Sequence, residues 1–181
     1  MDFKKKVAEF VDCFKNIPNF DFLGRLKTIV KDIPGLIALA GATLMLIGAF
    51  VPNFSLVEKN YFYTVTSYWN LFQVGGWFVF ALTLFALGLA YFKQTFWAGA
   101  TAALALTITV IQGITFPATA AAGSYGMITS GVHVGWFFLL LGELAVIGAF
   151  VLEEFVFGKK AAAPVAPVAE APVVTDNTNA Q

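Results

Sequence analysis

One acidic residue, Glu143, lies deep inside an apolar stretch of the chain and is the first candidate for chemistry. Roughly 10 residues separate it from each end of that stretch, which is roughly 15 Å along a helix. A carboxyl group at such a depth in a membrane is costly, and it is a functional-site hypothesis by default. No Lys or Arg lies within an apolar stretch, so burial favours the uncharged acid.

Threonines provide the polar partners that a buried carboxyl group needs. Thr43, Thr83 and Thr107 each fall near the middle of another apolar stretch, which predicts a polar layer of these residues and Glu143 at mid-membrane. Such a layer has three alternative uses, namely to hold helices together, to carry protons or cations, or to contact another membrane protein. A buried Thr can also donate to the carbonyl four residues before it and then needs no partner.

No other residues have the spacing of a catalytic, metal or cofactor site. The patterns of zinc proteases, serine hydrolases and phosphate-binding loops are absent. The chain has one histidine, His133, and one cysteine, Cys13, which fall at opposite ends of the predicted helices. We therefore expect no enzyme, no cofactor and no metal, and we interpret His133 as a solvated residue at the membrane interface.

Four long apolar stretches supply the elements that would position Glu143 and the threonines. They cover residues 33–51, 71–92, 96–116 and 132–152. Each is about 20 residues long, the length that a helix needs to cross a bilayer core roughly 30 Å thick. Hydrophobic residues make up 59% of the chain and charged residues 12%, which is far from the balance of a soluble domain. The sequence predicts an all-α, polytopic bundle of four transmembrane helices within residues 33–158.

Two different tails flank the predicted bundle. Residues 1–32 alternate Phe, Val, Leu and Ile with Lys and Arg at helical spacing, broken at Pro18, which predicts two short amphipathic helices. Helices of this kind lie in the headgroup plane, although packing on a partner protein is an alternative. Residues 159–181 are rich in Ala, Pro and Val, which favours a disordered tail.

The basic residues predict the orientation. With four crossings, every Lys and Arg except Lys59 falls on the side that holds both termini. The positive-inside rule makes that side cytoplasmic, so we expect both termini in the cytoplasm and a location in the plasma or inner membrane. The formal net charge is zero, which gives no reason to expect nucleic acid as a partner.

Small residues predict where the helices approach one another. In lipid, helix association depends on close contact and hydrogen bonds, and small residues allow that contact. Five glycines of the first and fourth stretches stand out as helix-packing candidates: Gly41, Gly48, Gly131, Gly135 and Gly142.

Aromatic residues gather in the first outer loop and at the outer helix ends. The members that we assign to an outer aromatic belt are Tyr61, Tyr63, Tyr68, Trp69, Trp77 and Trp136. Tyr and Trp favour the headgroup level, which supports a belt. Clustered aromatic residues also anchor protein interfaces, so a docking surface is the alternative. Residues 61–67 are rich in strand formers, and they also fit a short strand.

Four crossings with a larger first outer loop resemble the layout of tetraspan junction proteins such as the claudins. The outer cysteine pair of that family is missing here, since Cys13 precedes the first crossing, and no residue role is carried over. We expect a non-enzymatic membrane subunit or scaffold that acts through lateral helix contacts. Its expected partners are the lipid bilayer, further copies of the chain or other membrane proteins. The alternative is a small proton- or cation-coupled transporter or channel that uses Glu143.

Overall fold

The computed structural model describes residues 3–15, 22–122 and 127–157. The predicted break at Pro18 and the predicted tail at 159–181 lie outside these ranges. The described chain is mostly helical and carries one small sheet. In order, its elements are α1 (Phe3–Lys15), α2 (Phe22–Val30), α3 (Ile33–Phe50), β1 (Phe54–Lys59), β2 (Thr64–Trp69), α4 (Trp77–Tyr91), α5 (Thr95–Ala121), β3 (Ile128–Val132), α6 (Val134–Val151) and a π-helical turn, η2 (Leu152–Phe157).

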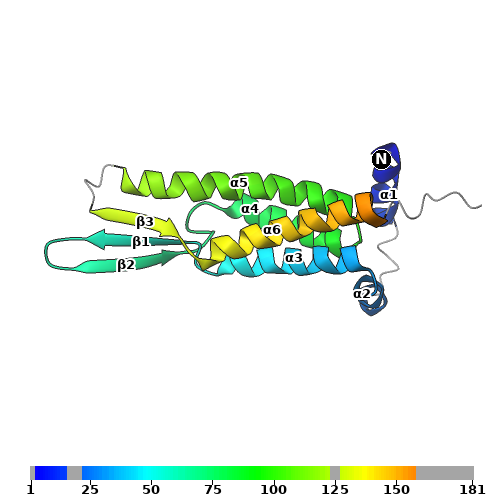
Figure 1. Ribbon diagram of the computed structural model, residues 1–181, viewed down its shortest axis with the longest axis horizontal. Coiled ribbons are helices and arrows are strands. Elements are labelled where there is room, and N and C mark those ends of the chain that lie inside the picture. Colours follow the sequence, from blue (N-terminus) through cyan, green and yellow to red (C-terminus); the bar gives the residue numbers. More distant parts are fainter. Residues whose placement is uncertain (1–2, 16–21, 123–126, 158–181) are drawn as a thin grey trace, which may run out of the picture.

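Four helices, α3 to α6, run alongside one another and form the body of the molecule (Figure 1). Each packs on its neighbours in the chain, and α6 closes the ring by packing most extensively on α3. Small side chains at the centre allow this close packing, because Ala38, Ala42, Ala102 and Ala105 are fully buried. Larger apolar residues such as Phe85 and Leu141 are more than half exposed on the outer surface, as expected for helices that face lipid.

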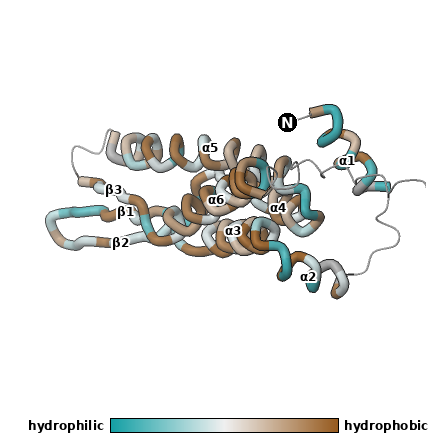
Figure 2. The backbone as a smooth tube through the Cα atoms, turned by 45° about the vertical axis from the view of Figure 1, so that its right-hand side comes forward, coloured by the Kyte–Doolittle hydropathy of each residue, from teal (hydrophilic) through white to brown (hydrophobic). Residues whose placement is uncertain are grey.

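Three of these helices are long and apolar enough to cross a membrane. They cover Ile33–Phe50, Thr95–Ala120 and Val134–Phe157, while α4 is apolar but shorter. Figure 2 shows that hydrophobic residues run along the helices of the bundle, whereas hydrophilic residues gather on α1, on α2 and at the far end of the β1–β2 hairpin. The helical part of the fold prediction and the apolar character of these segments are therefore confirmed.

A three-stranded antiparallel sheet corrects the expectation of an all-α fold. Its strand order is β2-β1-β3, with Phe54 opposite both Trp69 of β2 and Val132 of β3. Alternate residues of β1 are buried, Phe54 and Leu56, because one face of the sheet packs beside α5. The sheet extends the body beyond the ends of α3 and α6 (Figure 1). Residues 61–67 contribute to it, as their composition indicated, but the strand begins at Thr64.

The second predicted crossing, 71–92, begins too early. Residues 71–76 form a turn, in which the backbone N–H groups of Asn70 and Gln73 each donate to the other residue's side-chain oxygen, at 2.8 and 3.2 Å. Gly75 adopts a φ of +77°, a left-handed conformation that suits glycine and prevents a continuous helix. For this reason α4 starts only at Trp77.

The third predicted crossing, 96–116, ends too early, because α5 continues through Pro117 to Ala121. Proline lacks an N–H group, so tertiary contacts have to support this last part of the helix. The Phe116 ring packs on Phe54 with 4.5 Å between ring centroids, and Ser130 Oγ of β3 donates to the Pro117 carbonyl at 3.1 Å. At 27 residues, α5 is about 40 Å long and reaches beyond the bundle along the sheet.

Candidate functional site

Glu143 lies on α6 and is fully buried inside a single chain. Its Oε1 accepts a hydrogen bond from the Thr109 hydroxyl of α5 at 2.7 Å. Thr109 is also buried, with 1% of its surface exposed, so this bond joins two helices inside the bundle. Glu143 Oε2 has no hydrogen-bond partner within the described residues. The arrangement can hold α5 against α6, and it leaves one carboxyl oxygen for a proton or another small partner.

Trp136 provides a second link between the same two helices. Its indole Nε1 donates to the carbonyl of Thr109 at 3.1 Å, so Thr109 is bonded through both its side chain and its backbone. The indole lies directly on Gly113, where an added Cβ would fall 2.6 Å from Nε1. Trp136 and Glu143 are seven residues apart, which places both on one face of α6. Sequence reasoning placed Trp136 in the aromatic belt and missed this role in helix pairing.

The polar layer predicted from the threonines is wrong in two of its members. Thr43 and Thr107 are exposed on the bundle surface, and each donates to a carbonyl of its own helix, that of Leu39 at 2.8 Å or of Ala103 at 2.9 Å. Thr83 is buried but bonds in the same way, to Val79 O at 2.9 Å. Glu143 instead pairs with Thr109, two positions along α5 from the predicted residue.

The glycines of α3 and α6 meet across the closest helix contact. An added Cβ on Gly41 would fall 2.8 Å from Gly142 O, and one on Gly48 would fall 2.9 Å from Gly135 O. Gly41 and Gly48 are two turns apart, as are Gly135 and Gly142, so the two antiparallel helices pair glycine with glycine at two levels. The prediction that Gly131, the remaining member of the set, packs between helices is wrong. This glycine lies in β3 opposite Ser55, because residues 128–132 pair with β1 and α6 begins only at Val134.

A polar junction joins α3, the sheet and α6. Asn53 is fully buried, and its side-chain amide donates to Gly48 O at 3.0 Å and to Val51 O at 2.9 Å, which satisfies carbonyls at the end of α3. The His133 backbone N–H donates to Asn53 O at 2.7 Å, and its ring meets Tyr68 edge to face at 5.1 Å. Asn53 Oδ1 and His133 Nδ1 lack hydrogen-bond partners in the part of the chain that the structure describes. His133 is therefore half-buried at this junction rather than solvated.

The predicted aromatic belt divides into two groups. Tyr61 and Tyr63 lie in the turn between β1 and β2, at the end of the sheet away from the helices, and are 91% and 56% exposed. The β1–β2 turn lies beyond the ends of α3, α4 and α6, although α5 runs alongside the sheet toward it, so Tyr61 and Tyr63 do not belong to a belt at the ends of those three helices (Figure 1). Tyr68 and Trp69 end β2 next to the bundle, and Trp77 begins α4, so these three remain candidates for the belt.

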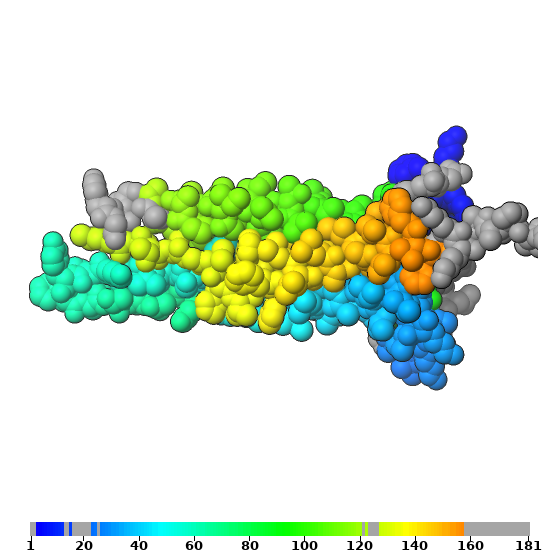
Figure 3. Space-filling model, viewed as in Figure 1, coloured from blue at the N-terminus to red at the C-terminus, as the bar shows by residue number. Residues whose placement is uncertain are grey.

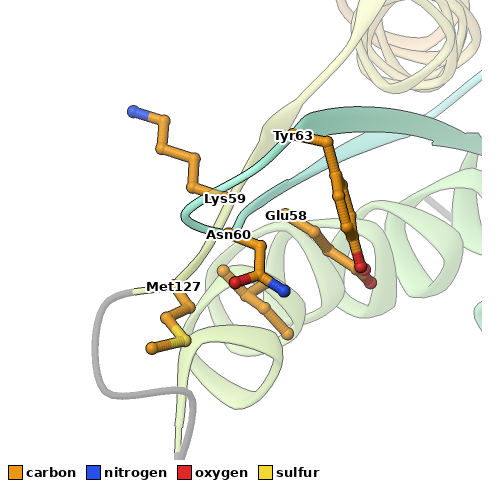
Figure 4. A pocket seen from close by; sticks show the side chains of 6 residues that line it. Glu58, Lys59, Asn60, Tyr63 and Met127 are labelled. Atoms are coloured by element: carbon orange, nitrogen blue, oxygen red, sulfur yellow. The ribbon is translucent and has the colours of Figure 1, made fainter.

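A small pocket lies beside that turn (Figure 4). It has a volume of about 200 Å³ and is lined by Glu58, Lys59, Asn60, Tyr63, Met127 and Ile128. Figure 4 shows the Glu58 and Tyr63 side chains extending to the same side, while Lys59 extends away from them. The opposite directions of Glu58 and Lys59 follow from the alternation of side chains along a strand. The pocket is shallow, and its lining residues contribute one carboxylate and one phenol to the same side.

The opposite end of the bundle carries an ion pair that ties α1 to η2. Lys6 Nζ lies 2.5 Å from Glu154 Oε1, and both side chains are about one-fifth exposed. Burial acts to lower the pKa of Lys6, but the hydrogen bond and the charge of Glu154 outweigh it and raise that pKa above its ordinary value. Nearby, Thr95 at the start of α5 donates a hydrogen bond from its hydroxyl to Glu153 of η2. Sequence reasoning did not pair Glu154 with the N-terminal helix, because the two segments are far apart in the chain.

Comparison with family models, with curated proteins and with solved structures found no match to this chain.

Proposed function

We propose that the protein is an integral membrane protein that crosses the bilayer four times and acts as a non-enzymatic scaffold or subunit. In this proposal the helices α3 to α6 form the membrane part, and the sheet projects on the outer side. The observation that carries the scaffold function is the complete enclosure of Glu143 within one chain, where it is bonded to Thr109. The buried acid then stabilises helix pairing and is shielded from the surrounding lipid.

The path of the chain supports four crossings, although α4 is short. At one end, Lys93 in the turn between α4 and α5 donates to Thr28 O of α2 at 3.2 Å and lies 3.6 Å from Asp32, next to the start of α3. At the other end, β1 continues α3 and β2 precedes α4. If α3 crosses the membrane, α4 has to return through it before α5 begins. The turn at 71–76 adds length to the 15 residues of α4.

The charge distribution supports a cytoplasmic position for the end that holds α1 and α2. The lysines of α1 and α2 lie at that end together with Lys93. Among the described residues of the sheet, the basic side chain is Lys59. By the positive-inside rule, the end with α1, α2 and Lys93 faces the cytoplasm. Tags at the two termini that were accessible from opposite faces of sealed vesicles would contradict this orientation.

Lateral contact requires a surface that the bundle has not already used. The paired glycines of α3 and α6 already contact each other within one chain. By contrast, an added Cβ on Gly88 of α4 would meet nothing within 4 Å. Gly88 lies in an apolar groove of about 160 Å³, lined also by Leu84, Phe85, Leu89 and Phe92. A small residue flanked by larger apolar ones lets a second helix approach closely, and we assign the groove to α4 of a second copy.

The test compares two glycines that are both open. Gly88→Leu fills the groove on α4, while Gly148→Leu adds the same side chain to α6 at a site where a Cβ also meets nothing within 4 Å. The stoichiometry of the complex in mild detergent should fall for Gly88→Leu and remain unchanged for Gly148→Leu. If the unmodified protein is a monomer without co-purifying partners, the lateral-contact function is wrong.

One observation favours a second candidate, a small proton- or cation-coupled transporter. Glu143 Oε2 is buried and has no hydrogen-bond partner among the described residues, so it has an unused binding position. Reconstitution into vesicles with a pH-sensitive dye tests this candidate directly. Flux that disappears in Glu143→Gln would favour transport, whereas vesicles that remain tight to protons and cations would exclude it.

A further inference from the structure

The two N-terminal helices lie across the end of the bundle, and each has an apolar stripe that is largely exposed, although Phe3 of α1 also contacts the Phe96 and Trp97 rings edge to face. On α1, Phe3, Val7 and Val11 follow at intervals of four residues and are 58%, 36% and 45% exposed. On α2, Leu23 and Val30 are 67% and 58% exposed. In a folded protein, exposed apolar stripes of this kind mark a surface that binds something, because leaving them in water is unfavourable.

Contacts with the bundle hold both helices in this crosswise position. In α1, Lys6 pairs with Glu154, Phe10 packs on Trp97 with ring centroids 5.4 Å apart, and the Trp97 indole donates to Lys6 O at 3.4 Å. In α2, Ile29 is fully buried, and the Thr28 carbonyl accepts a bond from Lys93. Neither helix is positioned to continue the bundle along its axis, so each lies at the level where the helices leave the membrane.

The two helices project from the bundle on opposite sides (Figures 1 and 3). At 13 and 9 residues they are about 20 and 14 Å long, and a helix is about 10 Å wide, so together they cover roughly 340 Å². Among the described residues, no helix projects sideways from the other end, which holds the sheet and the end of α5 (Figure 3). The molecule therefore has a larger cross-section at its cytoplasmic end.

The charges next to the apolar stripes identify the occupant. Lys27 and Lys31 are exposed beside the stripe of α2 and form no ion pair within the described residues. On α1, Lys5 is 74% exposed, with Glu9 4.0 Å away. Apolar stripes flanked by lysines match a leaflet with anionic headgroups, and Phe3 of the α1 stripe contacts Phe96 and Trp97 at the start of α5.

We propose that α1 and α2 insert into the cytoplasmic leaflet and make the protein a wedge that senses membrane curvature. Amphipathic helices in an interface expand the leaflet that contains them, and their binding depends on curvature. The protein should concentrate where the cytoplasmic leaflet is the outer, expanded leaflet of a curved membrane, and anionic lipid should strengthen this preference. The inference takes its orientation from the proposed function, but it does not require lateral contacts between copies.

The full chain, labelled at its C-terminus and reconstituted into giant vesicles of neutral and anionic phospholipid, provides the test. Tubes are pulled from the vesicles, and protein density is compared between tube and flat membrane, separately for molecules with their termini outside or inside. Molecules with termini outside should be severalfold denser on the tube, and those with termini inside should be depleted. Equal density in tube and flat membrane for both groups would overturn the proposal.

Matched valines separate insertion of α1 from other causes of sorting. Val11→Gln removes part of the α1 stripe and should reduce the enrichment. Val65→Gln in β2 changes a valine with the same 45% exposure outside the membrane and should leave the enrichment unchanged. Unchanged sorting by the α1 variant would overturn the role of the stripe, and equal enrichment in neutral vesicles would overturn the role of anionic headgroups. Tags on opposite faces would instead refute the four-crossing orientation, so the two failures can be told apart.

Discussion

Gly41 of α3 and Gly142 of α6 approach so closely that neither has space for a side chain. An added Cβ on Gly41 would lie 2.8 Å from Gly142 O, and one on Gly142 would lie 2.6 Å from Gly41 O. The obstructing atoms belong to the backbone, which cannot turn aside as a flexible side chain can. The contact therefore determines the distance between the two helices that pack most extensively, and Glu143 follows directly after Gly142.

Gly142→Ala should destabilise the bundle by about 1–3 kcal/mol, because the added methyl group forces α3 and α6 apart. Gly148→Ala on the same helix is the matched control, since a Cβ there meets nothing within 4 Å. The control should be neutral or slightly stabilising, as alanine is the better helix former. Unfolding in mixed micelles of mild detergent and sodium dodecyl sulfate measures both. Equal stability of the two variants would contradict the close glycine contact.

Glu143→Gln should be mild and Glu143→Leu harmful. The amide can still accept the bond from Thr109, whereas leucine removes the acceptor. Interhelical hydrogen bonds in membranes contribute about 0.6 kcal/mol on average and up to about 1.7 kcal/mol, so the loss should fall in that range. The same unfolding measurement applies. Equal tolerance of both substitutions would remove the case for the bond.

A double-mutant cycle provides the control for this bond. Thr109→Val should destabilise the parent protein but have little further effect when Glu143 is already Leu, because the two changes remove one interaction. Additive effects would show that Thr109 and Glu143 contribute independently.

Composition and apolar length predicted the helices, because long apolar stretches without charged residues are typical of helices long enough to cross a bilayer. The sheet was harder to predict, because its strands are short and pair across more than 70 residues, as Phe54 does with Val132. The predicted ends of two helices were wrong for local reasons. The turn before α4 depends on the positive φ of Gly75, and the extension of α5 beyond Pro117 depends on contacts with β1 and β3.

The position of Glu143 along its helix was predicted correctly, but the residue of α5 that faces it was not. Glu143 is buried at mid-helix, and a threonine of the neighbouring helix does bind it. The predicted residue on that helix, Thr107, faces outward, because a difference of two residues turns a side chain by about 200° around a helix. Sequence alone does not show which face of a helix points into the bundle when the helix is apolar on all sides, since such a helix has no polar face to orient it.

Lys6→Gln should loosen α1 from the bundle by about 1 kcal/mol, because it removes the pair with Glu154 while keeping much of the side chain. The pKa of Lys6 in the folded protein lies above 10.5, so its contribution is fully present below pH 10.5 and is lost as pH rises through that higher pKa. Hydrogen exchange of the α1 backbone amides at neutral pH measures the loosening. Lys5→Gln is the control, since Lys5 is 74% exposed, and it should leave the exchange unchanged.

Phe54→Ala should release the sheet from α5. The Phe54 side chain is 1% exposed and packs on Phe116, and loss of a buried Phe costs about 3–5 kcal/mol. Phe62→Ala is the matched control, because Phe62 is 93% exposed in the β1–β2 turn and should contribute little to stability. Limited proteolysis of the sheet in sealed vesicles measures the difference, since a released sheet is cut within β1 to β2 while the membrane helices remain protected. If both variants resist cleavage equally, the contact between Phe54 and Phe116 does not hold the sheet, and the extension of α5 past Pro117 must have another support.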